Sequence, residues 1–391
     1  MADAVDSGGE MDTRLRLLVL TDTAILESGG SERFLRNLLV RLPADRYLVD
    51  VIQLCAEIPS AQIAADLNAP HIRLAYHPVG AIYRRPGFAA WSYLRRQAQA
   101  GAYDLVQSHH EKSDLIAALL PRGPRRLRKL SNRRDMGFQK TGKLRWLMRR
   151  LNRRFDRIVA PSAAIIDALE RTENVEPARC ICIANGVDTT RFAPADASAR
   201  IRLRGALGYG EGDFLIGCVA MLIPVKRHLD LIDAFALVHA QLPQARLLLI
   251  GEGELRGEIE ARIAELGLGE AVRLSGECKD VENILRTLDL FVLPSSSEGL
   301  SNAILEAQAC ALPVVATRVG GNPELVRDDC GLLVSPHDPA ALAAALLELL
   351  RDAPRRARFG AAARERIVRE HSLDAMTAAY AALHRDLVDA R

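Results

Sequence analysis

The start of the chain contains three segments of different periodicity: LRLLVL at residues 15–20, SERFLRNLLVRL at residues 31–42 and YLVDVIQL at residues 47–54. The first and third are short apolar runs, which are typical of buried strands. In the second, apolar residues recur every three or four positions, as they do on one face of a helix. A strand, a helix and a second strand in this order predict a β-α-β unit with parallel strands. We therefore expect an α/β fold.

The same alternation continues along the chain and starts again in its second half. The later strand-like runs cover residues 105–108, 157–160, 214–221, 246–250, 271–275, 288–293, 314–317 and 332–334. Between the halves, RFAPADASAR at residues 191–200 has no periodicity and reads as a linker. We expect two Rossmann-like domains whose parallel sheets face a central cleft.

The predicted boundaries follow from these patterns. We expect a disordered tail at 1–12, an N-terminal domain at 13–190, the linker at 191–200, a C-terminal domain at 201–372, and a helix at 373–391 that packs back on the N-terminal domain.

Composition excludes several classes of protein. The chain has 391 residues, of which 49% are hydrophobic and 26% charged, as in ordinary globular proteins. Its longest apolar runs are far shorter than the roughly 20 residues that a membrane-spanning helix needs. The first twelve residues carry four acids and no Lys or Arg, unlike a secretory signal, so we expect a cytoplasmic protein. The seven cysteines are scattered, which indicates buried thiols and no disulfide framework.

Charge is distributed unevenly. Residues 1–200 carry nine more Lys and Arg than Asp and Glu, whereas residues 201–391 carry six fewer. Residues 122–154 contain 14 Lys and Arg against the single acid Asp135, with Trp146, Met148 and other apolar residues between them. This segment is either a solvated helix that packs on the sheet or a surface that binds the inner face of an anionic membrane. It carries no recognisable nucleic-acid recognition motif, so we expect no nucleic-acid partner.

The densest chemical signal is PSSSEGLSNAILE at residues 294–306. It follows a strand and opens a helix near Asn302, so Glu298 is expected in the loop at the carboxyl end of a strand and Glu306 one turn into the helix. The backbone amides of Leu300 to Ala303 form a helix N-terminus suited to a diphosphate. A loop acid, an anion-binding amide cluster and a helical acid together suit a nucleotide-sugar. The alternative is a plain loop followed by a solvated helix.

This stretch resembles the E-x7-E motif of family-four retaining glycosyltransferases, which have the GT-B fold. The likeness extends from about Leu15 to Val388 and includes five further segments in the same order. They are Gly29-Gly30-Ser31-Glu32-Arg33, Asp104 to His110, Asn185 to Asp188, Pro224-Val225-Lys226 and Val319 to Glu324.

The resemblance implies a set of site residues. His109, Lys226 and Glu298 are the expected catalytic residues, with His109 contacting the transferred sugar and Lys226 stabilising the leaving diphosphate. The expected donor-binding residues are Gly29, Gly30, Lys226, Gly251, Gly253, Glu298, Gly299, Leu300, Ser301, Asn302 and Glu306. Turn glycines, a solvated lysine and a structural histidine are the alternatives for Gly29, Gly30, Lys226 and His109. No metal site and no cofactor are expected.

The family usually has an Arg five residues before the Lys, and this chain has Met221 there. The implied activity is transfer of a hexosyl group, with retention, from a nucleoside diphosphate sugar to a hydroxyl of a glycan or lipid-linked acceptor. UDP is favoured over GDP, and the implied context is cell-envelope or exopolysaccharide biosynthesis. A nucleotide-sugar epimerase of the same fold and a non-catalytic nucleotide-sugar binding protein are the alternatives.

Overall fold

The structure is a computed structural model that describes residues 13–25, 30–55, 67, 69–80, 84–134 and 141–390. The expected tail at 1–12 and the expected site residue Gly29 lie outside the described residues. The chain folds into two compact units. The first comprises the described residues of Met1–Arg133, Trp146–Val159 and Tyr380–Arg391, and the second comprises those of Arg134–Arg145 and Ala160–Ala379.

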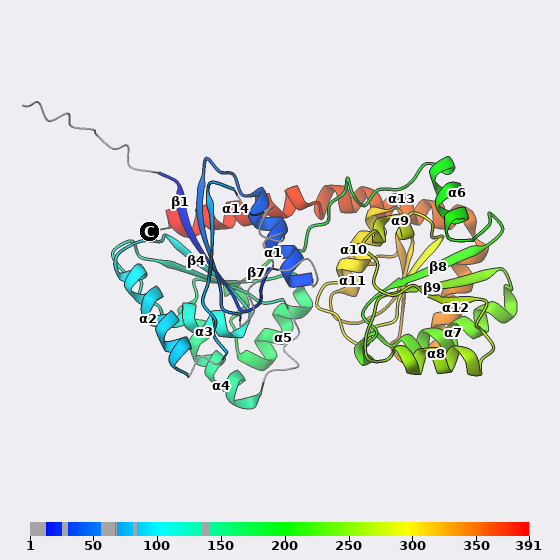
Figure 1. Ribbon diagram of the computed structural model, residues 1–391, viewed down its shortest axis with the longest axis horizontal. Helices are drawn as coiled ribbons and strands as arrows, with labels where there is room; N and C mark the ends of the chain where they lie inside the picture. Colours follow the sequence, from blue (N-terminus) through cyan, green and yellow to red (C-terminus); the bar gives the residue numbers. More distant parts are fainter. Residues whose placement is uncertain are drawn as a thin grey trace, which may run out of the picture. The chain divides into compact units, whose positions relative to one another are not determined.

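A seven-stranded sheet organises the N-terminal half of the chain, with strand order β3-β2-β1-β4-β5-β6-β7 (Figure 1). The pairings from β3 through to β6 are all parallel. In β1, Leu17 to Leu20 are at most 1% exposed, as expected for a strand covered on both faces. The strands are β1 (Leu15–Thr21), β2 (Tyr47–Gln53), β3 (Ile72–Tyr76), β4 (Leu105–His109), β5 (Arg128–Asn132), β6 (Arg157–Ala160) and β7 (Cys180–Cys182). The helices are α1 (Gly30–Arg41), α2 (Arg85–Gln99), α3 (Glu111–Leu119), α4 (Gly142–Leu151) and α5 (Ala163–Glu173).

The second unit contains a six-stranded parallel sheet with strand order β10-β9-β8-β11-β12-β13. Its strands are β8 (Phe214–Val219), β9 (Ala245–Ile250), β10 (Val272–Leu274), β11 (Leu290–Leu293), β12 (Val314–Thr317) and β13 (Gly331–Val334). The helices from residue 197 to the end of the chain are α6 (Ala197–Ala206), α7 (His228–Gln241), α8 (Arg256–Glu265), α9 (Val281–Leu285), α10 (Asn302–Ala309), α11 (Asn322–Leu325), α12 (Pro339–Arg351), α13 (Ala353–Glu370) and α14 (Leu373–Asp389). The residues of α14 from Tyr380 on belong to the first unit. One apolar core that includes Ile216, Leu247 and Phe291 joins this sheet to its helices. The prediction of two Rossmann-like parallel sheets is confirmed.

Strand order reverses once in each sheet. The reversal lies between β1 and β4 in the first sheet and between β8 and β11 in the second. In open α/β sheets, ligands bind outside the carboxyl ends of the strands at such a switch point. The loops that follow β1, β4, β8 and β11 are therefore the candidate ligand-binding loops.

The basic segment 122–154 is predicted from its sequence to be a solvated helix or a membrane-binding surface. That prediction is wrong for the residues of β5, which form a buried strand of the sheet. β5 runs through this segment, because pairing with β4 and β6 outweighs the polar pattern of its sequence. Lys129 is buried and its Nζ donates to the carbonyl oxygens of Ala118 and Leu120, and burial lowers the pKa of Lys129 to about 8. Arg133 is buried and ion-paired with Asp114 at 2.9 Å.

One further difference concerns a predicted boundary. α6 begins at Ala197, inside the expected linker, because Asp196 caps it by accepting a hydrogen bond from the Ala199 amide at 2.7 Å. Among the described helices, none combines the length and apolar character needed to cross a bilayer.

The last turns of α14 are fixed in the first unit by buried hydrogen bonds. Tyr380 donates to Asn132 Oδ1 at 2.6 Å, and His384 Nε2 lies 2.8 Å from Gln107 Oε1. The Tyr47 hydroxyl lies 3.4 Å from the other ring nitrogen of His384. His384 is fully buried, and burial lowers its pKa to about 3, so the imidazole is neutral.

We expect His384 to make the first unit sensitive to acid. The unfolded chain binds a proton at this residue near pH 6.5 and the folded chain does not, so stability falls as the pH drops through that value. His384 should account for about 2 kcal/mol of the loss between pH 7 and pH 5, measured by urea unfolding as the amount by which the loss is smaller in His384→Gln than in wild type. The control His337→Asn, at a residue whose side chain is 55% exposed, should keep the wild-type pH dependence. Equal slopes for wild type and His384→Gln would contradict the assignment.

Candidate functional site

An ion pair spans the switch point of the second sheet. Lys226 lies in a short 3-10 helix (Pro224–Lys226) that follows β8, and Glu298 lies in the loop that follows β11. Lys226 Nζ donates to Glu298 Oε1 at 2.6 Å. The two side chains are only 19% and 9% exposed, so solvent screens the pair weakly. The structure thus brings together two of the three residues predicted to be catalytic.

The Glu298 carboxylate has a second support. Ser295, which is fully buried, donates from Oγ to the same Oε1 at 2.6 Å. The two loops are also joined by their backbones, since the Ser296 amide donates to the Val225 carbonyl at 2.8 Å. Both side-chain bonds that the described residues make to Glu298 use Oε1, which leaves Oε2 as an acceptor for a ligand hydroxyl.

α10 starts next to this pair. Ser301 caps it, and its side chain accepts a hydrogen bond from the Ile304 amide. The first helical residue, Asn302, accepts a hydrogen bond from Asn185 Nδ2 at 2.6 Å. The predicted helix start at Asn302 is confirmed, and Gly299, Leu300 and Ser301 form the approach to it. A helix N-terminus attracts anions, so this loop can hold a phosphate group.

Glycines let a third loop pack against Glu298. Gly320 has φ +50°, and a Cβ there would lie 1.7 Å from the Glu298 carbonyl oxygen. A Cβ on Gly321 would lie 2.3 Å from the Gly299 carbonyl oxygen, which also accepts a hydrogen bond from the Gly321 amide at 3.1 Å. The backbone position of the Glu298 loop therefore depends on two residues without side chains.

Gly251 and Gly253 likewise allow close backbone packing, here against the loop that leads to Lys226. A Cβ on Gly251 would lie 2.0 Å from the Ala220 carbonyl oxygen, and one on Gly253 would lie 2.4 Å from that of Leu222. Both glycines follow β9 and allow its loop to pack on the residues after β8. This contact explains both residues structurally, and their role in donor binding stays a prediction.

Glu306 lies in α10 and is 8% exposed. Its charge contributes to the surroundings of Arg191, whose pKa is raised chiefly by the hydrogen bond to Glu282. Burial raises the pKa of the neighbouring Cys310 thiol to about 12, and Glu306 adds to that shift. Glu306 is thus a buried acid of α10, the helix that starts next to the ion pair, and the alternative of a solvated helix residue is wrong.

The sequence patterns predict no role for Ser295, Gly320 or His228. Ser295 and Gly320 lie inside motifs quoted above, but their roles depend on contacts between loops.

His228 is 1% exposed, and neither of its ring nitrogens has a partner among the described residues. Burial, aided by the charge of Lys226, lowers the pKa of His228 to about 4, so it stays neutral beside the lysine.

His109 ends β4 at the switch point of the first sheet, and it is buried. Gln107 accepts from His384 through Oε1, so its amide nitrogen donates to His109 Nε2 at 3.0 Å. Since Nε2 accepts, the proton of a neutral His109 is on Nδ1. His109 and the exposed Gly30 belong to the first unit, whereas Lys226, Glu298 and the other described site residues belong to the second.

Asp22 occupies the other side of that switch point. Its carboxylate accepts hydrogen bonds from the backbone amides of Lys112 at 2.6 Å and Ser113 at 2.7 Å, in the first turn of α3. Burial raises the pKa of Asp22 to about 6. In the part of the chain that the structure describes, no group of three or more His, Cys, Asp or Glu is arranged to hold a metal ion. The expectation of a metal-free reaction stays a prediction.

Two family models match consecutive parts of the chain. "Glycosyltransferase Family 4" matches residues 28–191, and "Glycosyl transferases group 1" matches residues 200–366. Among curated proteins, the chain is 37% identical over 203 residues to a GDP-mannose-dependent monoacylated alpha-(1-6)-phosphatidylinositol monomannoside mannosyltransferase from Corynebacterium glutamicum, which covers 50% of this chain and 53% of the relative. It is 32% identical over 182 residues to UDP-Gal:alpha-D-GlcNAc-diphosphoundecaprenol alpha-1,3-galactosyltransferase from Escherichia coli, which covers 46% of this chain and 47% of the relative. The chain spans about half the length of these two relatives.

A solved structure has the same fold. HepE from Anabaena in complex with UDP and glucose superposes with a TM-score of 0.80 at 22% identity, over 96% of this chain and 100% of that one. At this level of identity the likeness supports the fold, and it agrees with the two parallel sheets described above.

We expect Gly320→Ala to destabilise the second unit. The new Cβ would meet a backbone atom in a left-handed conformation, which should cost roughly 1 to 3 kcal/mol. Thermal unfolding followed by calorimetry should show a lower midpoint. Gly257→Ala in α8 is the matched control, because no atom lies within 4 Å of its Cβ position and Ala favours helix. An unchanged midpoint in Gly320→Ala would contradict the packing described for the Glu298 loop.

Proposed function

We propose, from the premise that the chain is a GT-B glycosyltransferase of the family-four type, that it transfers a hexosyl group from a nucleoside diphosphate sugar to an acceptor hydroxyl with retention. The acceptor is a glycan or a lipid-linked sugar in cell-envelope or exopolysaccharide biosynthesis. Curated relatives that act on such acceptors support this class. UDP is the first nucleotide to test and GDP the second, since the relatives include proteins named for each.

The observation that carries the proposal is the Lys226–Glu298 pair at the switch point. Lys226 offers the diphosphate a cation that Glu298 holds in place, and the amides at the start of α10 offer further donors. Met221 is 61% exposed and uncharged, and Arg227 is engaged by Asp230 at 2.7 Å. Lys226 is therefore the cation that this loop supplies to the leaving group.

The reaction needs no covalent nucleophile from the protein. The bond between the anomeric carbon and the diphosphate oxygen breaks while the acceptor oxygen bonds to the same face of the sugar. The acceptor proton passes to the leaving diphosphate. The protein supplies orientation, which is worth several kcal/mol, and fixed charge. Glu298 Oε2 binds a hexose hydroxyl, Glu306 binds ribose hydroxyls and His109 contacts the transferred sugar.

Two other functions would use the same donor site. An epimerase would isomerise the donor without an acceptor, and a binding protein would hold the donor without turnover. Mass spectrometry of a panel of UDP- and GDP-sugars, incubated with and without acceptor extracts, separates these outcomes. Transfer that depends on acceptor supports the transferase.

We expect the replacement of Glu298 and of Glu306 by Gln to affect different kinetic constants. Glu298 binds the hexose as its charge develops and also holds Lys226, so Glu298→Gln should lower kcat more than it raises KM. Glu306 binds groups that do not change during the reaction, so Glu306→Gln should mainly raise KM and weaken donor binding. Each loss should be roughly 1.5 to 3 kcal/mol, or about ten- to a hundredfold.

Steady-state kinetics with donor titration by calorimetry measures both effects. Glu258→Gln, at an exposed residue of α8, is the control and should behave as wild type. If Glu298→Gln and Glu306→Gln both bind and turn over donor as wild type does, neither residue is in the site.

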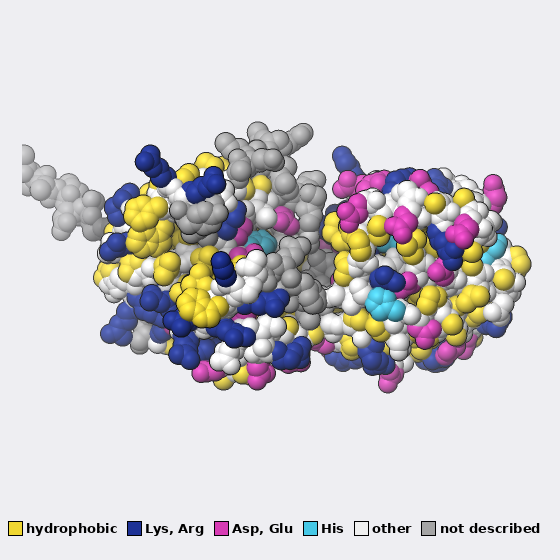
Figure 2. Space-filling model, turned by 90° about the horizontal axis from the view of Figure 1, so that it is seen from below, with side chains coloured by type: hydrophobic (Ala, Val, Ile, Leu, Met, Phe, Trp, Pro, Cys, Tyr) yellow, Lys and Arg dark blue, Asp and Glu magenta, His cyan; other side chains and the backbone are white. Residues whose placement is uncertain are grey.

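We also propose that the exposed face of α4 and the 3-10 turn after it bind anionic lipid at the inner face of the membrane. Trp146 is 55% exposed and stacks with Arg150, whose guanidinium carbon lies 4.2 Å from the ring centre. Arg149, Arg153 and Arg154 are exposed nearby in sequence, whereas Met148 and Leu151 are buried. Figure 2 shows Lys and Arg side chains gathered with apolar ones between them on one face of the first unit. An exposed aromatic among arginines suits a headgroup layer.

Flotation with vesicles of phosphatidylglycerol and phosphatidylcholine tests this surface. Each basic residue adds on the order of 1 kcal/mol near an anionic surface, so replacing Arg149, Arg150 and Arg153 by Gln should release the protein. Replacing Arg256 and Arg262 of α8 by Gln is the control and should leave binding intact. No flotation of wild type even at low salt would refute the membrane surface.

A further inference from the structure

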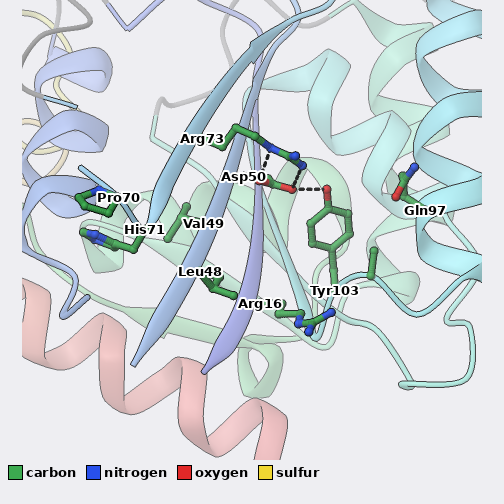
Figure 3. A pocket seen from close by; sticks show the side chains of 10 residues that line it. Arg16, Leu48, Val49, Asp50, Pro70, His71, Arg73, Gln97 and Tyr103 are labelled. Carbon is green, nitrogen blue, oxygen red and sulfur yellow. Dashed lines mark hydrogen bonds and ion pairs between the residues drawn. The ribbon is translucent and has the colours of Figure 1, made fainter. Parts of the chain in front are cut away.

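The first unit contains a pocket of about 380 Å³ that the proposed reaction does not use (Figure 3). It is lined by residues of β1, β2, β3 and α2 and by the segments that precede β3 and β4. The lining residues are Arg16, Leu48, Val49, Asp50, Pro70, His71, Arg73, Gln97, Ala102 and Tyr103. A pocket of this size accommodates a small organic ligand.

Its position separates it from the expected acceptor side of this unit. Strand pairing places Arg16 beside Leu48 and Asp50 beside Arg73, in the first residues of their strands or near them. His109 is six residues after Tyr103, at the other end of β4, which at about 3.3 Å per residue is roughly 20 Å away. The pocket thus lies toward the amino-terminal ends of the strands, opposite the switch-point edge.

Asp50 supplies the only carboxylate among the described residues that line the pocket, and this carboxylate is already bonded. Asp50 accepts two hydrogen bonds from Arg73, at 2.9 and 2.7 Å, and one from the Tyr103 hydroxyl at 2.6 Å. Burial and the Asp50 charge raise the pKa of Tyr103, so the phenol keeps its proton and remains the donor. Figure 3 shows this Arg73–Asp50–Tyr103 cluster at one side of the pocket. It neutralises Asp50, so no other carboxylate among the described lining residues is available to pair with Arg16.

Two lining side chains have buried nitrogens that lack partners. Among the described residues, nothing accepts a hydrogen bond from Arg16 Nε, and neither Nδ1 nor Nε2 of His71 is bonded. His71 is 8% exposed. An unsatisfied buried polar group costs about 1 to 3 kcal/mol, so such groups in a folded protein call for an explanation. A bound ligand with an anionic group and hydroxyls would satisfy both residues.

We propose that this pocket binds a sugar phosphate. The phosphate pairs with the Arg16 guanidinium, whose planar donors match an oxyanion. His71, which offers a donor and an acceptor when neutral, pairs with hydroxyls, and the sugar ring packs on Leu48 and Pro70. The net charge of the described lining residues is also suited to an anion, because Arg16 and Arg73 carry two positive charges and Asp50 one negative charge. The inference does not depend on the proposed transferase reaction.

Calorimetry of the full chain with glucose 6-phosphate tests this pocket. We expect saturable binding, with inorganic phosphate at least tenfold weaker and glucose without detectable binding. Arg16→Gln and His71→Leu should each lower the affinity for glucose 6-phosphate at least about tenfold, which is the loss expected for a charged hydrogen bond. His71→Leu should not lower the unfolding midpoint without ligand, because it removes unpartnered polar atoms.

Two control variants test whether the measured heat of glucose 6-phosphate binding comes from this pocket. Arg85→Gln, at an exposed residue in the first turn of α2, and Lys226→Met, in the donor site of the second unit, should bind glucose 6-phosphate as wild type does. Loss of binding in Lys226→Met but not in Arg16→Gln would assign the ligand to the donor site and overturn the proposal. No binding to wild type, equal affinity for inorganic phosphate, or tighter binding of citrate would also overturn it.

Discussion

The ion pair between Lys226 and Glu298 is the constraint on which the second unit's ligand site depends. It joins the loops after β8 and β11, the two neighbouring strands between which strand order reverses. Separating these charges would leave each with little solvent, at a cost on the order of 3–5 kcal/mol. A ligand that binds Lys226 beside Glu298 must therefore bring its own negative charge. A diphosphate meets that requirement, and an uncharged sugar does not.

At the switch point of the first unit, a side chain of the protein occupies the helix N-terminus. Asp22 accepts hydrogen bonds from two amides of α3, so this helix N-terminus is already occupied by an anion of the protein itself. α10 differs, since only the short side chain of Ser301 caps it in the described structure. At the switch points, phosphate binding is thus favoured in the second unit and disfavoured in the first. This asymmetry supports the proposal that the C-terminal half binds the donor and the N-terminal half the acceptor.

Sequence patterns predicted the repeated parallel sheets because buried parallel strands are continuous apolar runs, as in β1 and β11. They missed β5, because its Lys129, like Arg133 directly after the strand, is polar but buried with partners supplied by other segments. In the site, Glu298, Lys226 and Ser301 could be placed from motif spacing. Ser295 and Gly320 could not, because their roles come from contacts between loops that are separate in sequence.

His109 shows how far such contacts reach. Its tautomer is set by Gln107, whose orientation is set by His384 at the end of the chain. A strand residue near the middle of the first unit and a helix residue 277 positions later therefore share one hydrogen-bond chain. Because His384 is neutral and buried, it keeps Gln107 Oε1 occupied and directs the Gln107 amide toward His109. Nε2 of His109 is thereby an acceptor already in use, so any sugar hydroxyl that this residue binds must accept from Nδ1.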